Sequence, residues 1–164
     1  MTSSWEKFEE LIKAEMRKVY TETVIDHSMN PRNLGVLNDA DGLASVTGPC
    51  GDTMEVRLKV RDGTISDASF TTNGCGTTIA SGSMVTELAK GKSLPEVQRI
   101  GQRDVLDALG GLPEESQHCA LLAANTLKEA IRDYLAMQRE PWKKTYRKHS
   151  PFTATDFRDK IDTV

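Results

Sequence analysis

Residues 54–63 read MEVRLKVRDG, and apolar and charged side chains alternate along them as far as residue 61. A period of two residues is typical of a β-strand that buries one face. The stretch ends on Asp62-Gly63, a dipeptide that favours a tight hairpin turn. Apolar residues recur after the turn, and their register slips once near Asp67 and Ala68, where a β-bulge would fit. The sequence therefore predicts an antiparallel hairpin.

A third, shorter strand and several helices surround this hairpin. Residues 43–47 carry a short mixed strand signal. Capping boxes at Ser3-x-x-Glu6 and Ser93-Leu94-Pro95-Glu96 mark two helix starts. Helical periodicity predicts helices after both capping boxes, over residues 4–18 and after Ser93. It predicts four others, around 20–27, from 76 to a stop at Gly91, over 104–109, and over 117–138 before Pro141.

Length, charge and cysteine count restrict the class of protein. The chain has 164 residues, which suits one domain with room for terminal extensions. A formal net charge of −3 gives no reason to expect a nucleic-acid or membrane partner, and no apolar run approaches the roughly 20 residues of a membrane span. The N-terminus is polar and acidic, unlike a signal or transit peptide. Three cysteines cannot all pair within one chain, so we expect a cytoplasmic protein with free thiols.

The three cysteines lie in contexts that favour a shared site. Cys50 precedes the first hairpin strand, Cys75 follows the second, and Cys119 directly follows His118. Because the start of one hairpin strand lies beside the end of the other, Cys50 and Cys75 are expected at the same edge of the sheet. Asp52 would project on the same side as Cys50 if that stretch is extended.

Two of these thiols are placed where a negative charge is stabilised. Cys75 and Cys119 both lie at predicted helix N-termini, where free backbone N–H groups favour the thiolate. Thiolates bind soft or borderline metals such as zinc and iron in iron–sulfur clusters. Simpler interpretations stay open, because a cysteine is often a small buried apolar residue, a histidine often an ordinary surface group, and an aspartate often a turn residue. The spacing lacks a Cys-x-x-Cys pair, so it is not that of a zinc finger.

Six separated motifs occur in one order along the chain, at residues 24–27 (VIDH), 30–33 (NPRN), 50–52 (CGD), 74–76 (GCG), 91–94 (GKSL) and 118–119 (HC). With them the chain resembles the iron–sulfur cluster assembly scaffold family, of the IscU or NifU N-terminal type, over roughly residues 20–137. Taken with the predicted elements, this resemblance implies an α+β fold. A small antiparallel three-stranded sheet would be packed on one side by about five helices, with an N-terminal amphipathic helix in addition.

The resemblance implies a scaffold rather than an enzyme. A cysteine desulfurase would deliver persulfide sulfur, iron would join it, and a labile [2Fe–2S] or [4Fe–4S] cluster would form and pass to apo-proteins. By motif, Cys50, Cys75 and Cys119 would be cluster ligands and sulfur acceptors, and Asp52 and His118 the remaining candidate ligands. Zinc would be the alternative occupant of the site.

Two further expectations concern single residues. A carboxylate or imidazole is a weaker ligand for iron than a thiolate, and transfer needs one weak corner. Replacing Asp52 with Ala should therefore lengthen the lifetime of the cluster. Tyr20 matches a tyrosine near the start of the family domain, where it would serve a homodimer contact or persulfide chemistry, although an ordinary surface or core tyrosine is the simpler interpretation.

The chain also departs from the family pattern. Bacterial IscU proteins carry Leu-Pro-Pro-Val-Lys before their His-Cys pair, the motif that a dedicated Hsp70 chaperone recognises, whereas residues 112–117 here read LPEESQ. This difference argues against chaperone-assisted release. The match leaves out both ends, so we expect an N-terminal helical extension (1–18), a scaffold domain (19–138) and a polar C-terminal tail (139–164) with a basic cluster around residues 143–149.

Two alternative functions remain at this point. A SufU-like zinc-dependent sulfurtransferase would accept persulfide and need not build a cluster, but that branch typically has an insertion before its last cysteine and lacks the adjacent histidine. His118 and the compact 76–117 segment argue against it. A purely structural zinc domain would normally close its site with four tight ligands, and Asp52 does not fit that role well.

Overall fold

The predicted hairpin forms the centre of the structure. In this computed structural model, which describes residues 3–142, β2 (Thr53–Arg61) and β3 (Thr64–Thr72) pair antiparallel. Asp62 and Gly63 both adopt positive φ, 53° and 72°, as a two-residue type I′ turn requires. β1 (Gly42–Thr47) pairs with the other side of β2, which gives the strand order β1-β2-β3.

The sheet differs from the sequence prediction in two details. Val60 pairs with Ile65 and Lys59 with Asp67, so the extra residue of the bulge is Ser66, slightly earlier than expected. The polar face of β2 is also not simply exposed, because Glu55 is 1% accessible and its carboxylate lies 2.8 Å from Nε of Arg57. A buried carboxylate needs such a partner, and alternation along the strand could not reveal it.

The helices begin and end close to the positions that their caps predict. Both predicted capping boxes form, at Ser3/Glu6 and at Ser93/Glu96. Gly110 adopts the left-handed conformation that ends α5. The helices are α1 (Ser4–Met16), α2 (Glu22–Met29), α3 (Gly76–Ala89), α4 (Leu94–Gln98), α5 (Gln102–Leu109) and α6 (Gln117–Arg139), with a 3-10 turn at Glu114–Ser116 before α6.

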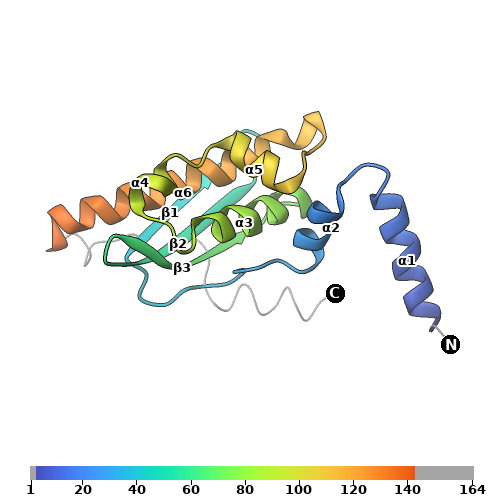
Figure 1. The fold of residues 1–164 in the computed structure, drawn as a ribbon, viewed down its shortest axis with the longest axis horizontal. Coiled ribbons are helices and arrows are strands. Elements are labelled where there is room, and N and C mark those ends of the chain that lie inside the picture. Colours follow the sequence, from blue (N-terminus) through green and yellow to red (C-terminus); the bar gives the residue numbers. More distant parts are fainter. Residues whose placement is uncertain (1–2, 143–164) are drawn as a thin grey trace.

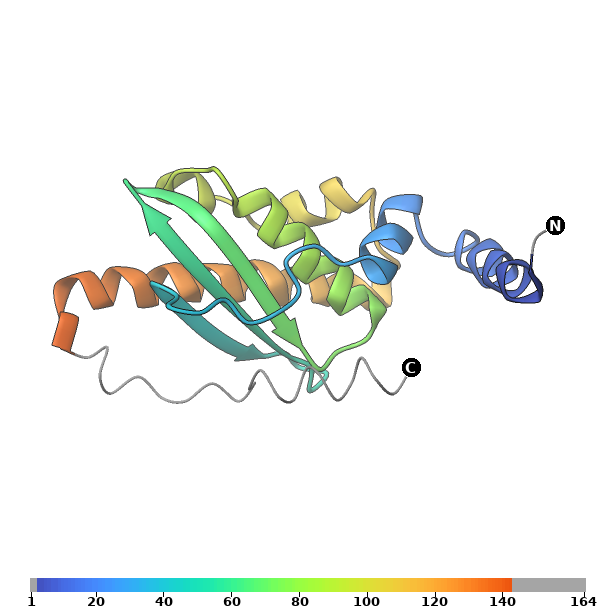
Figure 2. The same ribbon diagram turned by 90° about the horizontal axis from the view of Figure 1, so that it is seen from below.

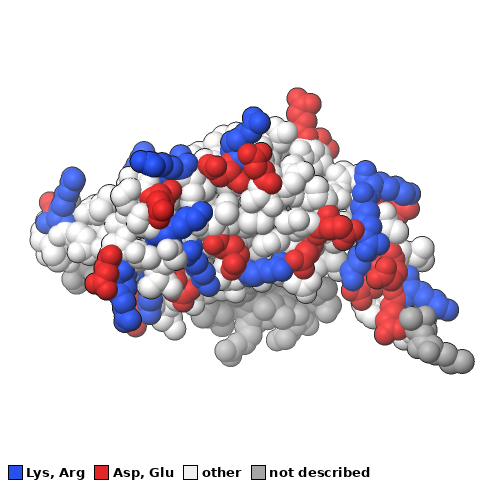
Figure 3. All heavy atoms as spheres, in the orientation of Figure 1, with Lys and Arg blue, Asp and Glu red and all other residues white. Residues whose placement is uncertain are grey.

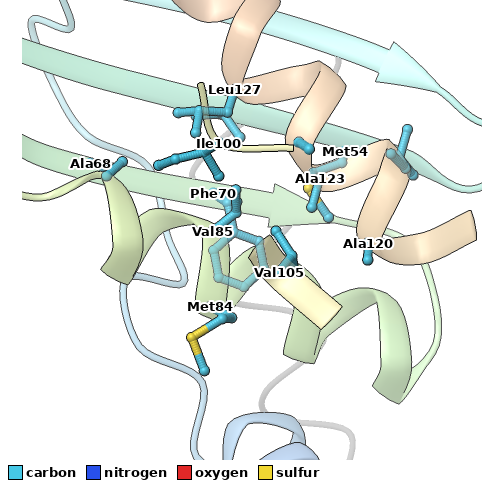
Figure 4. Packing of buried hydrophobic residues seen from close by; sticks show 14 of the residues in the cluster. Met54, Ala68, Phe70, Met84, Val85, Ile100, Val105, Ala120, Ala123 and Leu127 are labelled. Carbon is cyan, nitrogen blue, oxygen red and sulfur yellow. The ribbon is translucent and has the colours of Figure 1, made fainter. Parts of the chain in front are cut away.

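A continuous apolar core joins the sheet to its helices. Phe70 of β3 lies among Val85 of α3 and Val105 of α5, and all three are fully buried (Figure 4). The apolar residues of β2 point into the same core, as the alternation predicts. Tyr20 is partly buried and packs against this cluster, so it is in part a core residue.

The architecture confirms the predicted fold class. Figures 1 and 2 show α3 and α6 lying together on one face of the three-stranded sheet, while α1 projects away from the body. No residue of α1 is buried, and Trp5 is 70% exposed. α3 and α6 both begin at the end of the molecule where β3 ends (Figure 2). The predicted site residues therefore lie on elements that start or stop at one end of the fold.

The surface carries no obvious charge patch on the face that Figure 3 shows, where basic and acidic side chains are interspersed. Within residues 3–142 no helix is long and apolar enough to cross a membrane. The predicted basic cluster at residues 143–149 lies outside the described residues.

Candidate metal centre

Cys75 occupies the junction between β3 and α3. It is the N-cap residue of α3, with an extended backbone (φ −79°, ψ −176°), and its side chain is exposed. Its Sγ lies 3.1 Å from Oγ1 of Thr77 and 3.7 Å from Oγ1 of Thr78. These two hydroxyls belong to the first turn of α3, so the helix start that the sequence predicts also brings donors to the thiol.

The surroundings of Cys75 favour its thiolate. Burial alone would raise the pKa of the Cys75 thiol, but hydrogen bonds from the Thr77 side chain and from the backbone N–H groups of Thr78 and Thr77 outweigh it, so the pKa is lowered. An exposed thiol with a lowered pKa is a better nucleophile and metal ligand at neutral pH than an ordinary cysteine.

Cys119 sits in the first turn of α6 but in a different environment. It is only 2% exposed, and its Sγ lies 3.5 Å from Oγ1 of Thr77 and 3.4 Å from Oγ1 of Thr78. Burial is the main reason that the pKa of Cys119 is raised, and its hydrogen bonds with Thr78 and Thr77 do not offset it. Cys119 is therefore held as a thiol in the metal-free protein.

Asp52 is tied to the same group of side chains through Thr78. The Thr78 hydroxyl donates to Oδ2 of Asp52 at 2.8 Å. Because a hydroxyl has a single proton, its contact with the sulfur of Cys119 has the thiol as donor and the threonine oxygen as acceptor.

Cys50 and His118 complete the group. Cys50 lies in a tight loop, where the N–H of Gly48 donates to the carbonyl of Asp52 at 2.8 Å and the N–H of Gly51 to the carbonyl of Gly48 at 3.0 Å. The exposed Sγ of Cys50 lies 3.2 Å from Nε2 of His118. The same ring nitrogen lies 3.7 Å from Sγ of Cys119.

The structure thus brings all five predicted residues together, and it adds two that the sequence reasoning missed. Contacts run from Cys50 through His118 to Cys119, and from there through Thr77 and Thr78 to Cys75 and Asp52. Within the described part of the chain, no three His, Cys, Asp or Glu side chains form a ready-made metal-binding group. The donors are linked in pairs or through hydroxyls, and their types suit iron or zinc. The sequence signal that could have identified Thr77 and Thr78 was their position two and three residues after Cys75, the N-cap of α3.

Comparisons with known proteins agree with this arrangement. The profile of the family described as NifU-like N terminal domain matches residues 19–141. The chain is 49% identical over 117 residues to the iron-sulfur cluster assembly scaffold protein IscU 1 of Archaeoglobus fulgidus, covering 71% of this chain and 76% of that protein. It is also 49% identical over 120 residues to the iron-sulfur cluster assembly scaffold protein IscU of Escherichia coli K12, covering 70% of this chain and 93% of that protein. A crystal structure of a hypothetical protein is similar at a TM-score of 0.56 and 30% identity, covering 67% of this chain and 94% of that one.

Proposed function

This chain belongs to the NifU-like N-terminal domain family, and from that premise we propose that it is a scaffold on which iron–sulfur clusters are assembled. A scaffold binds its cargo and releases it without catalytic turnover. The observation that carries the proposal is the convergence of three thiols, an imidazole and a carboxylate from three distant segments at one end of the fold.

We assign roles to the five residues from their chemistry and surroundings. Cys50, Cys75 and Cys119 would bind the iron of the cluster, because thiolates are the ligands that hold such clusters in proteins. Asp52 and His118 would provide the remaining, weaker ligand. The cluster is cargo, of [2Fe–2S] or [4Fe–4S] type, and zinc is the alternative occupant that the donor set allows.

Cys75 is the thiol best suited to accept sulfur from a cysteine desulfurase. It combines an exposed sulfur with a lowered pKa, whereas Cys119 is buried and its pKa is raised. In the transfer, the thiolate of Cys75 attacks the outer sulfur of the desulfurase persulfide. The S–S bond of that persulfide breaks and the desulfurase cysteine leaves as a thiolate, so a new persulfide forms on Cys75 without any change in electron count.

Asp52 would be the corner at which the cluster is released. A carboxylate binds iron more weakly than a thiolate, and Asp52 is only partly buried. We predict that Asp52→Ala lengthens the lifetime of an assembled cluster and slows its transfer, measured as the decay of visible absorption and the rate of apo-ferredoxin activation. A cluster that decays faster in Asp52→Ala than in the parent protein would contradict this role.

Partners and location follow from the same proposal. A cysteine desulfurase and apo-proteins that receive clusters are the partners that a scaffold needs, and a homodimer is a further proposal. Three free cysteines suit a reducing compartment such as the cytoplasm. We also keep the division into a helical extension, a scaffold domain and a tail as a prediction, and residues 112–117 still argue against a dedicated Hsp70 partner.

Anaerobic reconstitution tests the proposed function. The protein is mixed with a cysteine desulfurase, cysteine and ferrous iron, and visible sulfur-to-iron charge-transfer bands are followed. Bands that appear and then move to an added apo-ferredoxin are the expected result. Persulfide formation with retained zinc and no bands would instead indicate a sulfurtransferase and would overturn the scaffold proposal.

A further inference from the structure

Thr78 uses its hydroxyl differently from three other buried helical hydroxyls of this fold, although Ser83 of α3 also makes long-range contacts, with Nδ1 of His27 and the N–H of Arg32. Ser81, Thr86 and Thr126 each donate to the carbonyl four residues earlier in their own helix. Thr78 is equally buried, at 0% exposure, yet its proton goes to Oδ2 of Asp52, 26 residues away in sequence. Gly74, four residues before Thr78, precedes the N-cap residue Cys75, so Thr78 has no helical carbonyl at that position and its hydroxyl is available for the bond to Asp52.

The surrounding backbone is shaped to allow this bond. A Cβ atom at Gly74 would lie 2.7 Å from Oδ2 of Asp52 and 2.7 Å from Cβ of Thr78, so no side chain fits there. The ends of both hairpin strands are also pinned next to Asp52, because the N–H of Thr53 donates to Oδ1 of Asn73 at 2.8 Å. The start of β2 is thereby fixed against the end of β3, with Asp52 directly before it.

Thr78 also faces two candidate ligands besides Asp52. Its Oγ1 lies 3.4 Å from Sγ of Cys119 and 3.7 Å from Sγ of Cys75. Thr77 contacts the same two sulfurs, at 3.5 Å and 3.1 Å, but within residues 3–142 it makes no hydrogen bond to Asp52. Thr78 is therefore the side chain that links the carboxylate to the thiols.

We propose that Thr78 is a positioning residue that holds the Asp52 carboxylate beside the three thiols, so that its second oxygen is free to bind the incoming metal. This inference rests on the proposed function, since it assumes that Asp52 is a ligand. A carboxylate has two oxygens, and a hydrogen bond to one of them orients the other. Hydrogen-bond partners of this kind typically change metal affinity about 10–100-fold when they are removed.

Cobalt(II) binding to the intact, metal-free chain tests the inference without a cluster. Cobalt reports its thiolate ligands through charge-transfer bands, and its affinity is measured by competition with a chelator at one pH. We expect Thr78→Val to lower the cobalt affinity about 10–100-fold, the range for lost partners of a metal ligand. Thr78→Ser keeps the hydroxyl and should restore affinity. Thr126→Val is the matched control, because it removes an equally buried helical hydroxyl that has only a local bond.

A double-mutant cycle separates positioning from a general structural effect. In an Asp52→Ala background, Thr78→Val should change cobalt affinity by no more than about twofold, the usual error for sites that no longer interact. An equal loss in both backgrounds would mean that Thr78 acts through the thiols or the fold, and would overturn the proposal. Thr78→Ala and Gly74→Ala are further variants, in case Thr78→Val does not fold. The former removes the hydroxyl, the latter fills the space between the two side chains, and each should lose affinity only while Asp52 is present.

The outcome is distinguishable from that of the proposed function. If the parent protein assembles a cluster and Thr78→Val matches Thr126→Val in cobalt affinity, the positioning role is wrong and the scaffold stands. If the parent assembles no cluster but the cobalt cycle behaves as expected, the scaffold proposal is wrong and the Asp52–Thr78 arrangement is a metal site of another kind.

Discussion

The starts of α3 and α6 are built alike and behave differently. Each carries a cysteine at or within its first turn, and both sulfurs contact the hydroxyls of Thr77 and Thr78. Cys75 is exposed and its pKa is lowered, whereas Cys119 is 2% exposed and its pKa is raised. A helix N-terminus is therefore not enough to activate a thiol, because the degree of burial decides which protonation state the protein stabilises.

This difference suggests a division of labour within one site. The exposed sulfur at the start of α3 is reachable by a partner protein, and the buried sulfur at the start of α6 is held in place by the core. His118 lies next to Cys119 in α6 and connects the buried sulfur to exposed Cys50. Four predictions test or sharpen the comparison between the two helix starts.

The largest expected effect is a difference in alkylation rate. Iodoacetamide should modify Cys75 far faster than Cys119 in the folded, metal-free protein at neutral pH. Each unit of pKa difference changes the thiolate fraction about tenfold, and the burial of Cys119 widens the gap. Peptide mass spectrometry over time measures both rates, and in denaturant they should become similar. Equal rates in the folded protein would show that the two starts do not differ in the proposed way.

The next effect is on the stability of the junction that precedes α3. Gly74→Ala should lower the free energy of unfolding by about 1–3 kcal/mol, because the new methyl group overlaps Asp52 and Thr78. Gly48→Ala is the matched control on the Cys50 loop, since its Cβ would meet the nearest atom, on Leu122, at an ordinary 3.5 Å. Urea denaturation of the two variants gives the comparison. A larger loss of unfolding free energy for Gly48→Ala would mean that the close contact at Gly74 does not determine the cost of adding a methyl group.

The sequence alone was sufficient to predict the elements that depend on local signals. Alternation along residues 54–61 and the Asp62-Gly63 turn were sufficient for the hairpin, and the capping boxes located two helix starts to the residue. Those signals are local, because they depend on backbone propensity and on neighbours within four residues. The placement of Cys50 and Cys75 at one edge followed from the hairpin topology.

What the sequence could not reveal depends on contacts between distant segments. Glu55 looked like an exposed strand residue and is buried beside Arg57. Thr78 looked like an ordinary helical residue and bonds to Asp52. The opposite pKa shifts of Cys75 and Cys119 come from tertiary burial, which the shared position at a helix start does not encode.

A smaller effect should follow from removing one hydroxyl. Thr77→Val replaces the hydroxyl that lies 3.1 Å from Sγ of Cys75 with a methyl group, so the pKa of Cys75 should rise and its alkylation at neutral pH should slow. Thr77→Ser should restore the parent rate. Cys119 should change little, because burial dominates its pKa. An unchanged pH profile for Cys75 alkylation in Thr77→Val would show that this hydroxyl does not lower the pKa of Cys75.

The smallest effect is the pH dependence of stability. Between the lowered pKa of Cys75 and the ordinary value of 9.0, the unfolded chain binds more protons at this residue, so Cys75 makes the free energy of unfolding rise with pH. Above pH 9.0 Cys119 acts in the opposite direction. Because its pKa is raised, the folded chain binds more protons at this residue, so the free energy of unfolding falls as pH rises. Urea titrations in reductant should show the rise flattened in Cys75→Ser and the fall flattened in Cys119→Ser. The reverse assignment would contradict the two pKa directions.

The most direct measurement is an anaerobic crystal structure of the reconstituted protein with iron anomalous data. We expect the iron peaks to lie within bonding distance of Sγ of Cys50, Cys75 and Cys119, with Asp52 or His118 at the remaining position. Iron peaks elsewhere in the molecule, with these three sulfurs left uncoordinated in every copy and at every subunit contact, would contradict a shared cluster site.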